Sequence, residues 1–300
     1  METNILNLPE QEYMLPGNRT CAGCTLSIAY RYILKALEGK AIITVPASCL
    51  TVLHGMYPTT SVLIPCLNVA FPSTAASASG LVAGLKALGK SDLTVVAFAG
   101  DGGTNDIGIQ GLSGAAERNT DFIYICYDNE AYMNTGTQRS SSTPLGAKTT
   151  TTPTGKRQHA KDMPHIMESH GVPYIATACP SYPADLYDKV RKAKDKNGMT
   201  RYIHISTPCA PGWLFPSKDA VTVGRLSVET GMFILYEIEN GTFQLTGKSR
   251  SMAEHETKLK PLASYMGLQG RFANISQERL EELQHWVNSR WNACLERTSQ

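Results

Sequence analysis

Val95-Val96-Ala97-Phe98-Ala99-Gly100-Asp101-Gly102-Gly103 is the stretch that decides the fold. Its apolar, β-branched first half predicts a buried strand, and the glycines predict a tight turn into a helix. A second predicted strand, 122–127, ends in Asp128-Asn129-Glu130-Ala131-Tyr132-Met133-Asn134-Thr135-Gly136. In doubly wound sheets ligands bind beyond the carboxyl ends of the strands. We therefore expect Asp101 and Asn129 at a ligand-binding edge.

The residues at this edge suit a phosphorylated ligand and its metal. A carboxylate and an amide oxygen are hard ligands of the kind that hold Mg²⁺ on a diphosphate. Gly100, Gly102 and Gly103 would let the backbone approach phosphate oxygens where the next helix begins. A Gly-Asp-Gly sequence by itself is more often an ordinary strand-to-helix turn, so the interpretation depends on the rest of the chain.

Strands and helices alternate through the first two thirds of the sequence. The predicted strands are 41–45, 93–99, 122–127, 174–177 and 202–206, and the predicted helices are 27–37, 73–88, 107–118, 163–170 and 184–194. This alternation predicts an α/β fold with a doubly wound, mostly parallel sheet covered by helices on both faces.

The alternation stops after about Trp213. Segments 232–238 and 242–245 flank Asn240-Gly241, which predicts a β-hairpin. A helix over 278–295 follows, with one apolar face formed by Leu280, Leu283, Val287 and Trp291. We predict a core domain, 1–215, and a C-terminal hairpin-and-helix arm, 216–300, that packs on the core or on a partner subunit.

Composition excludes several classes of protein. Charged residues make up 18% of the 300 residues, against roughly 25% in ordinary soluble domains, and 42% are hydrophobic. This favours a chain that buries much of its surface, in part against other subunits. A net charge of +2 argues against nucleic-acid binding and against disorder. Neither a secretory signal nor a membrane-spanning run is recognisable, so we expect a cytoplasmic protein.

Eight cysteines in a cytoplasmic protein are not expected to form disulfides. Cys21 and Cys24 form a Cys-x-x-Cys pair, which suits zinc, a redox disulfide or an iron–sulfur cluster, and the pair alone does not choose among these. Cys49 and Cys209 each follow a predicted strand through a proline, which places them at the same edge as Asp101.

The two quoted segments resemble the thiamine diphosphate motif, because residues 103–128, 26 in all, separate Gly102 from Asn129. Over 17–213 the chain resembles the 2-oxoacid:ferredoxin oxidoreductase family, and within it the β subunit of pyruvate:ferredoxin oxidoreductases. The resemblance includes Tyr174-Ile-Ala-Thr-Ala and Thr207-Pro-Cys-Ala-Pro-Gly-Trp.

The resemblance implies a thiamine diphosphate site with Mg²⁺. Asp101, the side chain of Asn129 and the carbonyl of Ala131 would bind the metal. Asn134 would face the reactive part of the cofactor as the catalytic residue, although Met-Asn-Thr-Gly also reads as a plain turn. The cofactor-binding residues would be Gly100, Asp101, Gly102, Gly103, Asn129, Ala131, Asn134 and Thr135.

The resemblance also implies a 4Fe–4S cluster on Cys21, Cys24, Cys49 and Cys209. Cys126 is expected in the core and Cys294 on the terminal helix, whereas only the resemblance sets Cys66 and Cys179 aside. We expect His54 and His204 to be structural. The basic run 189–196 is expected to be a solvated helix face, with docking of an acidic ferredoxin as the alternative.

The implied reaction is oxidative decarboxylation of a 2-oxoacid, pyruvate first, to acyl-CoA and CO₂, with electrons passed through the cluster to ferredoxin. The chain lacks a Cys-x₂-Cys-x₂-Cys-x₃-Cys run, so onward clusters would sit on a ferredoxin-like subunit. The family places the activating glutamate on an α subunit, so this chain should be inactive alone. Otherwise Glu117, Glu130 and Glu168 would be the candidates.

The substrate is the least determined part of the resemblance. Pyruvate enzymes typically carry Trp, His and an acidic residue where this chain has Val62, Asn68 and Ser73. Oxalate, a branched-chain or an aromatic 2-oxoacid therefore stays open. Two other classes also remain: a non-oxidative thiamine diphosphate decarboxylase or synthase with structural zinc, and a non-catalytic scaffold subunit that holds a metal.

Overall fold

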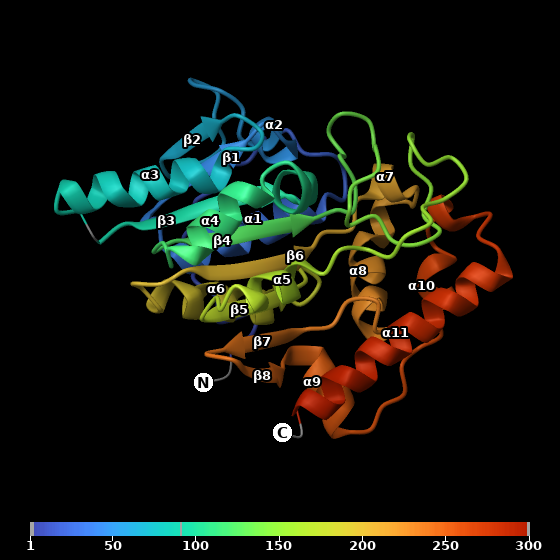
Figure 1. The fold of residues 1–300 in the computed structure, drawn as a ribbon. Coiled ribbons are helices and arrows are strands. Elements are labelled where there is room, and N and C mark those ends of the chain that lie inside the picture. Colours follow the sequence, from blue (N-terminus) through green and yellow to red (C-terminus); the bar gives the residue numbers. More distant parts are fainter. Residues whose placement is uncertain (1–2, 91, 299–300) are drawn as a thin grey trace.

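An eight-stranded sheet with the order β2-β1-β3-β4-β6-β5-β7-β8 forms the centre of the molecule (Figure 1). The computed structural model describes residues 3–90 and 92–298. Six neighbouring strands are parallel, and β7 and β8 extend the sheet as antiparallel strands. The strands are β1 Ala41–Pro46, β2 Cys66–Val69, β3 Thr94–Gly100, β4 Ile123–Asp128, β5 Tyr174–Ala178, β6 Arg201–Ser206, β7 Tyr236–Glu239 and β8 Thr242–Leu245. The predicted mostly parallel α/β sheet is confirmed.

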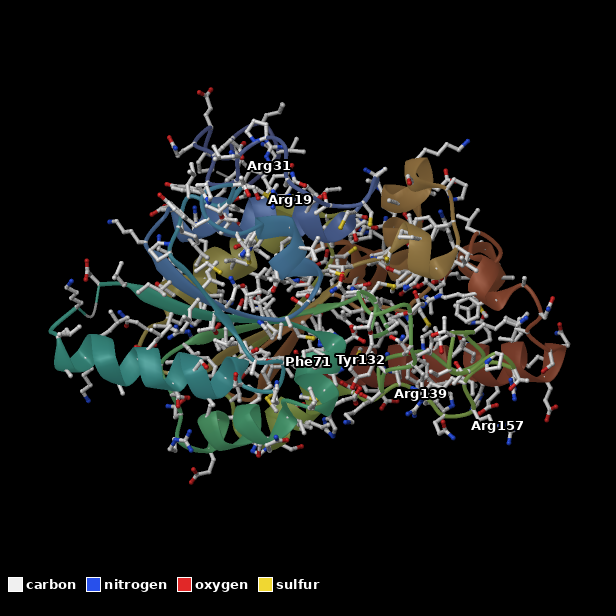
Figure 2. All side chains as sticks on the ribbon, turned by 90° about the horizontal axis from the view of Figure 1, so that it is seen from above. Arg19, Arg31, Phe71, Tyr132, Arg139 and Arg157 are labelled. Carbon is white, nitrogen blue, oxygen red and sulfur yellow. The ribbon has the colours of Figure 1, made fainter. Side chains whose placement is uncertain are left out.

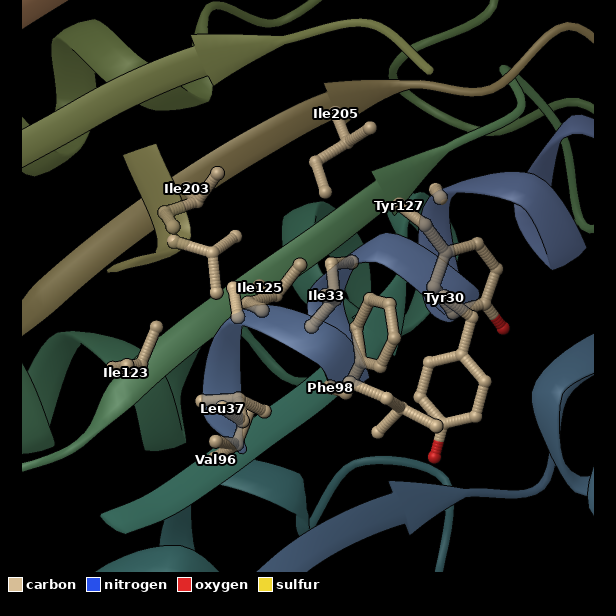
Figure 3. Packing of buried hydrophobic residues seen from close by; sticks show 14 of the residues in the cluster. Tyr30, Ile33, Leu37, Val96, Phe98, Ile123, Ile125, Tyr127, Ile203 and Ile205 are labelled. Carbon is tan, nitrogen blue, oxygen red and sulfur yellow. The ribbon is translucent and has the colours of Figure 1, made fainter. Parts of the chain in front are cut away.

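Helices cover both faces of the sheet, as parallel strands require. Helices α1 (Thr25–Leu37) and α6 (Pro183–Asp195) pack on one face, and α3 (Thr74–Ala87), α4 (Ile109–Glu117) and α5 (Met163–Ser169) pack on the other. Side chains of β3 alternate between the two faces, so that Val96 and Phe98 meet α1 while Ala97 and Ala99 face α3 and α4 (Figure 3). Each fully buried large apolar side chain contributes about 1.5–3 kcal/mol.

Several elements carry no strong signal in the sequence. They are β2 at the sheet edge, α2 (Cys49–His54), α7 (Ala210–Trp213), α8 (Ala220–Glu229), α9 (Gly247–Glu254) and α10 (Leu262–Met266), with the short helical turns η1 (Gly102–Asp106), η2 (Ser217–Asp219) and η3 (Gly270–Phe272). Most of these are shorter than the ten to twelve residues over which helical periodicity becomes readable. Within residues 3–90 and 92–298, no helix combines the length and the apolar character needed to cross a bilayer.

The C-terminal segment packs against the preceding part of the chain. The predicted hairpin forms around Asn240 and Gly241, which both have positive φ, and β7 pairs with β5. Its first strand begins at Tyr236 rather than 232, because 232–235 pack as a loop. The long helix α11 (Gln277–Thr298) buries Leu283 and Val287 in one cluster with Trp213. The division into a core domain and an arm at residue 215 stays a prediction.

The basic run 189–196 is only in part the solvated face that we expected, since Arg191 is exposed but the lysines are not. Lys189 is 3% exposed, and its ammonium donates to the Thr177 carbonyl, to Asp185 and to Thr246 Oγ1. Other lysines of the run form ion pairs with Glu237 and Glu239 of β7. The expectation failed for these lysines because β7 adds acidic side chains beside α6. The sequence of the helix alone does not reveal this contact.

Candidate functional site

The loops that follow β1, β3 and β4 meet at one edge of the sheet. Strands β2 and β3 lie on opposite sides of β1, so the winding direction changes there and leaves a crevice beyond the strand ends. A cavity of about 220 Å³ occupies this crevice. All eight residues predicted for the cofactor site line it: Gly100, Asp101, Gly102, Gly103, Asn129, Ala131, Asn134 and Thr135. The structure therefore brings the set together, and the role of each residue stays a prediction.

Three polar groups converge at the inner end of this cavity. One terminal atom of the Asn129 amide lies 2.9 Å from the Ala131 carbonyl oxygen and 3.1 Å from Oδ1 of Asp101. With nitrogen in that place, the amide donates hydrogen bonds to both groups. With oxygen there, three oxygens face one another at about the spacing of adjacent ligands around an octahedral Mg²⁺ with bonds of about 2.0–2.1 Å. The donor set therefore fits a hard divalent cation.

Asp101 is buried in a way that favours a neighbouring positive charge. The residue is 1% exposed, and its Oδ2 accepts a hydrogen bond of 2.5 Å from Ser140 Oγ. Burial, and then the charge of Asp128, hold the pKa of Asp101 well above its usual range. A bound cation would reverse this balance, because it stabilises the ionised carboxylate.

The glycine turn after β3 is packed under two aromatic rings. A Cβ at Gly102 would lie 2.6 Å from the ring of Tyr132, and one at Gly103 would lie 3.3 Å from Phe71. The two rings contact each other edge to face, with centroids 5.9 Å apart (Figure 2). Tyr132 is held in place by donating a hydrogen bond to Asp106. The close approach of Tyr132 is thus sufficient by itself to require glycine at position 102.

A second cavity, of about 280 Å³, is lined by the four predicted cluster cysteines, Cys21, Cys24, Cys49 and Cys209. Burial and the neighbouring thiols raise the pKa of Cys49 and of Cys209 to about 12. Across the described part of the chain, no three His, Cys, Asp or Glu side chains are arranged to hold a single metal ion. The four thiols surround a space instead of meeting at a point.

Local structure explains how distant cysteines reach this cavity. The Cys21–Cys24 turn is closed by a hydrogen bond from the Cys24 N–H to the Cys21 carbonyl, with Gly23 at a φ of +71°. Thr25 Oγ1 donates to the Pro208 carbonyl at 2.8 Å, which joins the start of α1 to the residue before Cys209. Cys49 is the first residue of α2, and only residues 47–48 separate it from the end of β1.

The two cavities share a wall. Four residues line both of them: Cys49, Asn129, Met133 and Asn134. Asn134 is exposed at the mouth, whereas Asn129 is 6% exposed. A ligand in the first cavity would therefore lie directly beside a group held by the cysteines.

The remaining candidates lie elsewhere. Cys126 and Cys179 are buried, and Cys294 lies on α11. His54 stacks on Tyr30 and contacts Cys66, while His204 bonds Asp128 and Tyr202, as expected of structural histidines.

Residues named for substrate choice and proton transfer also fall outside the lining of the first cavity. Among described residues, that lining contains none of Val62, Asn68, Ser73, Glu117, Glu130 and Glu168. Phe71, Tyr132 and Trp213 were not among the predicted residues, because an aromatic side chain next to a motif carries no signal of its own.

Known proteins resemble this chain over most of its length. Residues 48–205 match the C-terminal TPP-binding domain of thiamine pyrophosphate enzymes. Pyruvate synthase subunit PorB of Methanothermobacter thermautotrophicus is 49% identical, covering 95% of this chain and 98% of that protein. Ketoisovalerate oxidoreductase subunit VorB of Pyrococcus horikoshii is 43% identical, covering 95% and 93%.

A solved structure shares the fold. The 2-oxoglutarate:ferredoxin oxidoreductase from Magnetococcus marinus aligns with a TM-score of 0.57 and 20% sequence identity, covering 73% of this chain and 82% of that chain. At this identity the likeness concerns the fold alone.

Proposed function

Because the chain belongs to the thiamine diphosphate-dependent 2-oxoacid:ferredoxin oxidoreductases, we propose that it is the subunit that binds the thiamine diphosphate and passes electrons from pyruvate to a 4Fe–4S cluster. The products are acyl-CoA, CO₂ and reduced ferredoxin. The observation that carries this proposal is the shared wall, since Cys49, Asn129, Met133 and Asn134 line both cavities.

In this proposal Asp101, Asn129 and the Ala131 carbonyl hold Mg²⁺, and the backbone of Gly100, Gly102 and Gly103 lies against the diphosphate. The convergence of the Asn129 amide, the Ala131 carbonyl and Oδ1 of Asp101 supports the metal assignment. When bound, thiamine diphosphate supplies an electron sink for decarboxylation of a 2-oxoacid. The protein's part is to orient the cofactor and to keep water away from it, which the paired rings of Phe71 and Tyr132 favour.

Asn134 is proposed as the catalytic residue. It stands at the mouth of the first cavity and in the wall of the second, and its amide can donate a hydrogen bond to a substrate oxygen. Thr135 lies beside it, and its hydroxyl donates to Gln138 Oε1 at 2.6 Å. This bond steadies the segment that presents Asn134.

The four cysteines are proposed to hold a 4Fe–4S cluster. They line one cavity, and the other four cysteines of the chain are absent from its described lining. A cluster there would accept electrons one at a time, next to the thiamine diphosphate. The competing assignment is structural zinc in a non-oxidative enzyme, which the colour of the purified protein separates: brown and bleached by reduction for the cluster, colourless for zinc.

Partner subunits complete the proposed site. None of the glutamates named above lines the first cavity, and Glu130 is engaged by Arg271. We therefore assign the activating glutamate and the substrate pocket to an α subunit, and the onward clusters to a ferredoxin-like subunit. The interface should be of the obligate class, above roughly 2,000 Å². We place the complex in the cytoplasm, where thiols stay reduced.

Pyruvate is the proposed substrate, because relatives named pyruvate synthase subunits reach 49% and 48% identity. A branched-chain 2-oxoacid is the second candidate, since relatives named ketoisovalerate oxidoreductase subunits reach 43% over the same share of the chain.

The test is anaerobic assay of the complex purified with its partner subunits. Pyruvate, ketoisovalerate, 2-oxoglutarate and oxalate are compared for ferredoxin reduction that requires coenzyme A. We expect the highest kcat/KM with pyruvate, and no turnover by this chain alone. Turnover by the isolated chain, or release of an aldehyde without reduction of ferredoxin, would refute the proposal.

A further inference from the structure

Arg271 belongs to the C-terminal segment. Its buried side chain lies between the loops that form the walls of the two cavities. It sits in η3 and is 3% exposed. Its Nε donates to Gln269 Oε1 at 2.9 Å, and its carbonyl accepts from the Lys148 N–H at 2.9 Å. A buried guanidinium is costly unless an opposite charge compensates it. The groups that contact Arg271 therefore indicate which parts of the chain it positions.

The charged partner is Glu130, between the two proposed metal ligands Asn129 and Ala131. Arg271 Nη1 lies 2.6 Å from Glu130 Oε2. Glu130 has a φ of +63°, a conformation that residues other than glycine seldom adopt. This backbone turn directs the Asn129 side chain and the Ala131 carbonyl toward the same point. The ion pair therefore bears on the residue whose conformation makes the metal site.

The second partner is Trp213, which follows the proposed cluster ligand Cys209. The guanidinium carbon of Arg271 lies 3.7 Å from the centroid of the Trp213 ring, a close cation–π contact. The indole N–H donates to the Asn129 carbonyl at 2.8 Å, and the backbone N–H of Trp213 donates to the Cys209 carbonyl at 2.8 Å. Trp213 thus binds both loops, and Arg271 covers its ring.

We infer that Arg271 is a positioning residue that fixes the metal-binding loop 129–131 and the cysteine loop 209–213 in position relative to each other. The inference rests on the proposed function, because it takes Asn129, Ala131 and Cys209 as ligands. Arg271 touches neither cavity, so its effect passes through Glu130 and Trp213. Groups that orient metal ligands in this way typically change metal affinity by roughly 10–100-fold when removed.

The first experiment uses Arg271→Met in the complete complex. We expect Mg²⁺-dependent thiamine diphosphate affinity, measured by calorimetry, to fall roughly 10–100-fold. The electron paramagnetic resonance spectrum of the reduced cluster should change as well, because Trp213 loses its cover. Compared with Arg271→Met, Arg271→Lys should restore the cofactor affinity and the cluster spectrum only in part, since an ammonium lacks the planar face that stacks on the indole.

A matched control separates positioning from stability. Arg201 is also a buried arginine, 2% exposed and paired with Asp121, but it lies at the opposite ends of the strands, at the start of β6. Arg201→Met should lower the melting temperature and leave cofactor affinity and cluster spectrum unchanged. If Arg271→Met behaves in the same way, the inference is wrong.

The double variant Arg271→Met/Glu130→Met removes both charges of the buried pair, which is often nearly neutral for stability. We expect it to recover the melting temperature lost in Arg271→Met without recovering cofactor affinity. Recovery of both would show that the pair acts only through stability.

Two ligand variants, Asp101→Asn and Cys209→Ser, complete the set. If they keep cofactor and iron, the proposed function fails. If they lose them while Arg271→Met does not, only the positioning role fails.

Discussion

The two cavities share a wall but are assembled in opposite ways. The groups at the inner end of the first, Asp101, Asn129 and Ala131, come from the ends of β3 and β4, which are hydrogen-bonded neighbours. The second takes its cysteines from three separate segments, around residues 21–24, 49 and 209. One site is a product of adjacent strands, and the other exists only after distant loops have packed.

Their burial differs accordingly. Asp101, Asn129 and Ala131 are 1%, 6% and 5% exposed, whereas Cys21 is exposed and its three companions are half-buried. The oxygen site is held by the core, and the cysteine site lies in the surface layer. We therefore expect that loss of a proposed metal ligand abolishes function without unfolding the chain, whereas loss of a cysteine loosens the loops around it.

Asp101→Asn should have the largest effect on cofactor binding and little effect on the fold. It removes the charged group among the proposed metal ligands, so calorimetry should detect no Mg²⁺-dependent thiamine diphosphate binding. The folded-state pKa of Asp101 lies above its unfolded value, so ionisation at neutral pH opposes folding of the cofactor-free chain. The melting temperature without cofactor should therefore stay level or rise. Unchanged affinity, measured against the exposed-residue control Asp195→Asn, would contradict the role proposed for Asp101.

Cys49→Ser and Cys209→Ser should each lower iron content and reduce stability. Cys126→Ser and Cys294→Ser should leave iron unchanged, because Cys126 is buried in β4 and Cys294 lies on α11. Iron per complex and proteolysis of the loops report the two effects separately. Loss of iron in Cys66→Ser or Cys179→Ser would mean that a different set of thiols holds the cluster.

Gly102→Ala should weaken cofactor binding less than Asp101→Asn does. The added methyl would lie 2.6 Å from the Tyr132 ring, and such overpacking costs about 1–3 kcal/mol. Gly80→Ala in α3 is the matched control, since a Cβ there meets open space and should stabilise the helix by about 1 kcal/mol. Urea unfolding and calorimetry measure both variants, and equal stability changes of the same sign would contradict the packing argument.

Lys192→Ala should have the smallest effect, because this side chain takes no part in either cavity. Its pairs with Glu237 and Glu239 are partly exposed, and such pairs contribute about 0.2–1 kcal/mol. The rate of ferredoxin reduction by the complex should not change. A several-fold fall in that rate, at unchanged kcat with an artificial dye, would restore the docking role for this helix.

Local sequence was enough to predict the sheet and to place Asp101 and Asn129 at the carboxyl ends of two of its strands. The run Val95–Gly103 contains a strand, its end and the turn that follows. The spacing from this run to Asn129 is the length of one helix and one strand. Asn240-Gly241 was likewise enough for the hairpin, because positive φ at both positions is a local preference. These features follow from strands, helices and turns that succeed one another along the chain, and each such element is short enough for a sequence pattern to record.

Only the tertiary structure decided the rest. It paired the lysines of α6 with β7 and placed Arg271 between Glu130 and Trp213. It also formed the cavity that Cys49 and Cys209, which residue patterns alone placed only at a strand edge, line together with Cys21 and Cys24. Each of these contacts joins residues far apart in the chain. Their energies come from burial and charge pairing that arise when the loops pack, so no periodicity or local preference in the sequence records them.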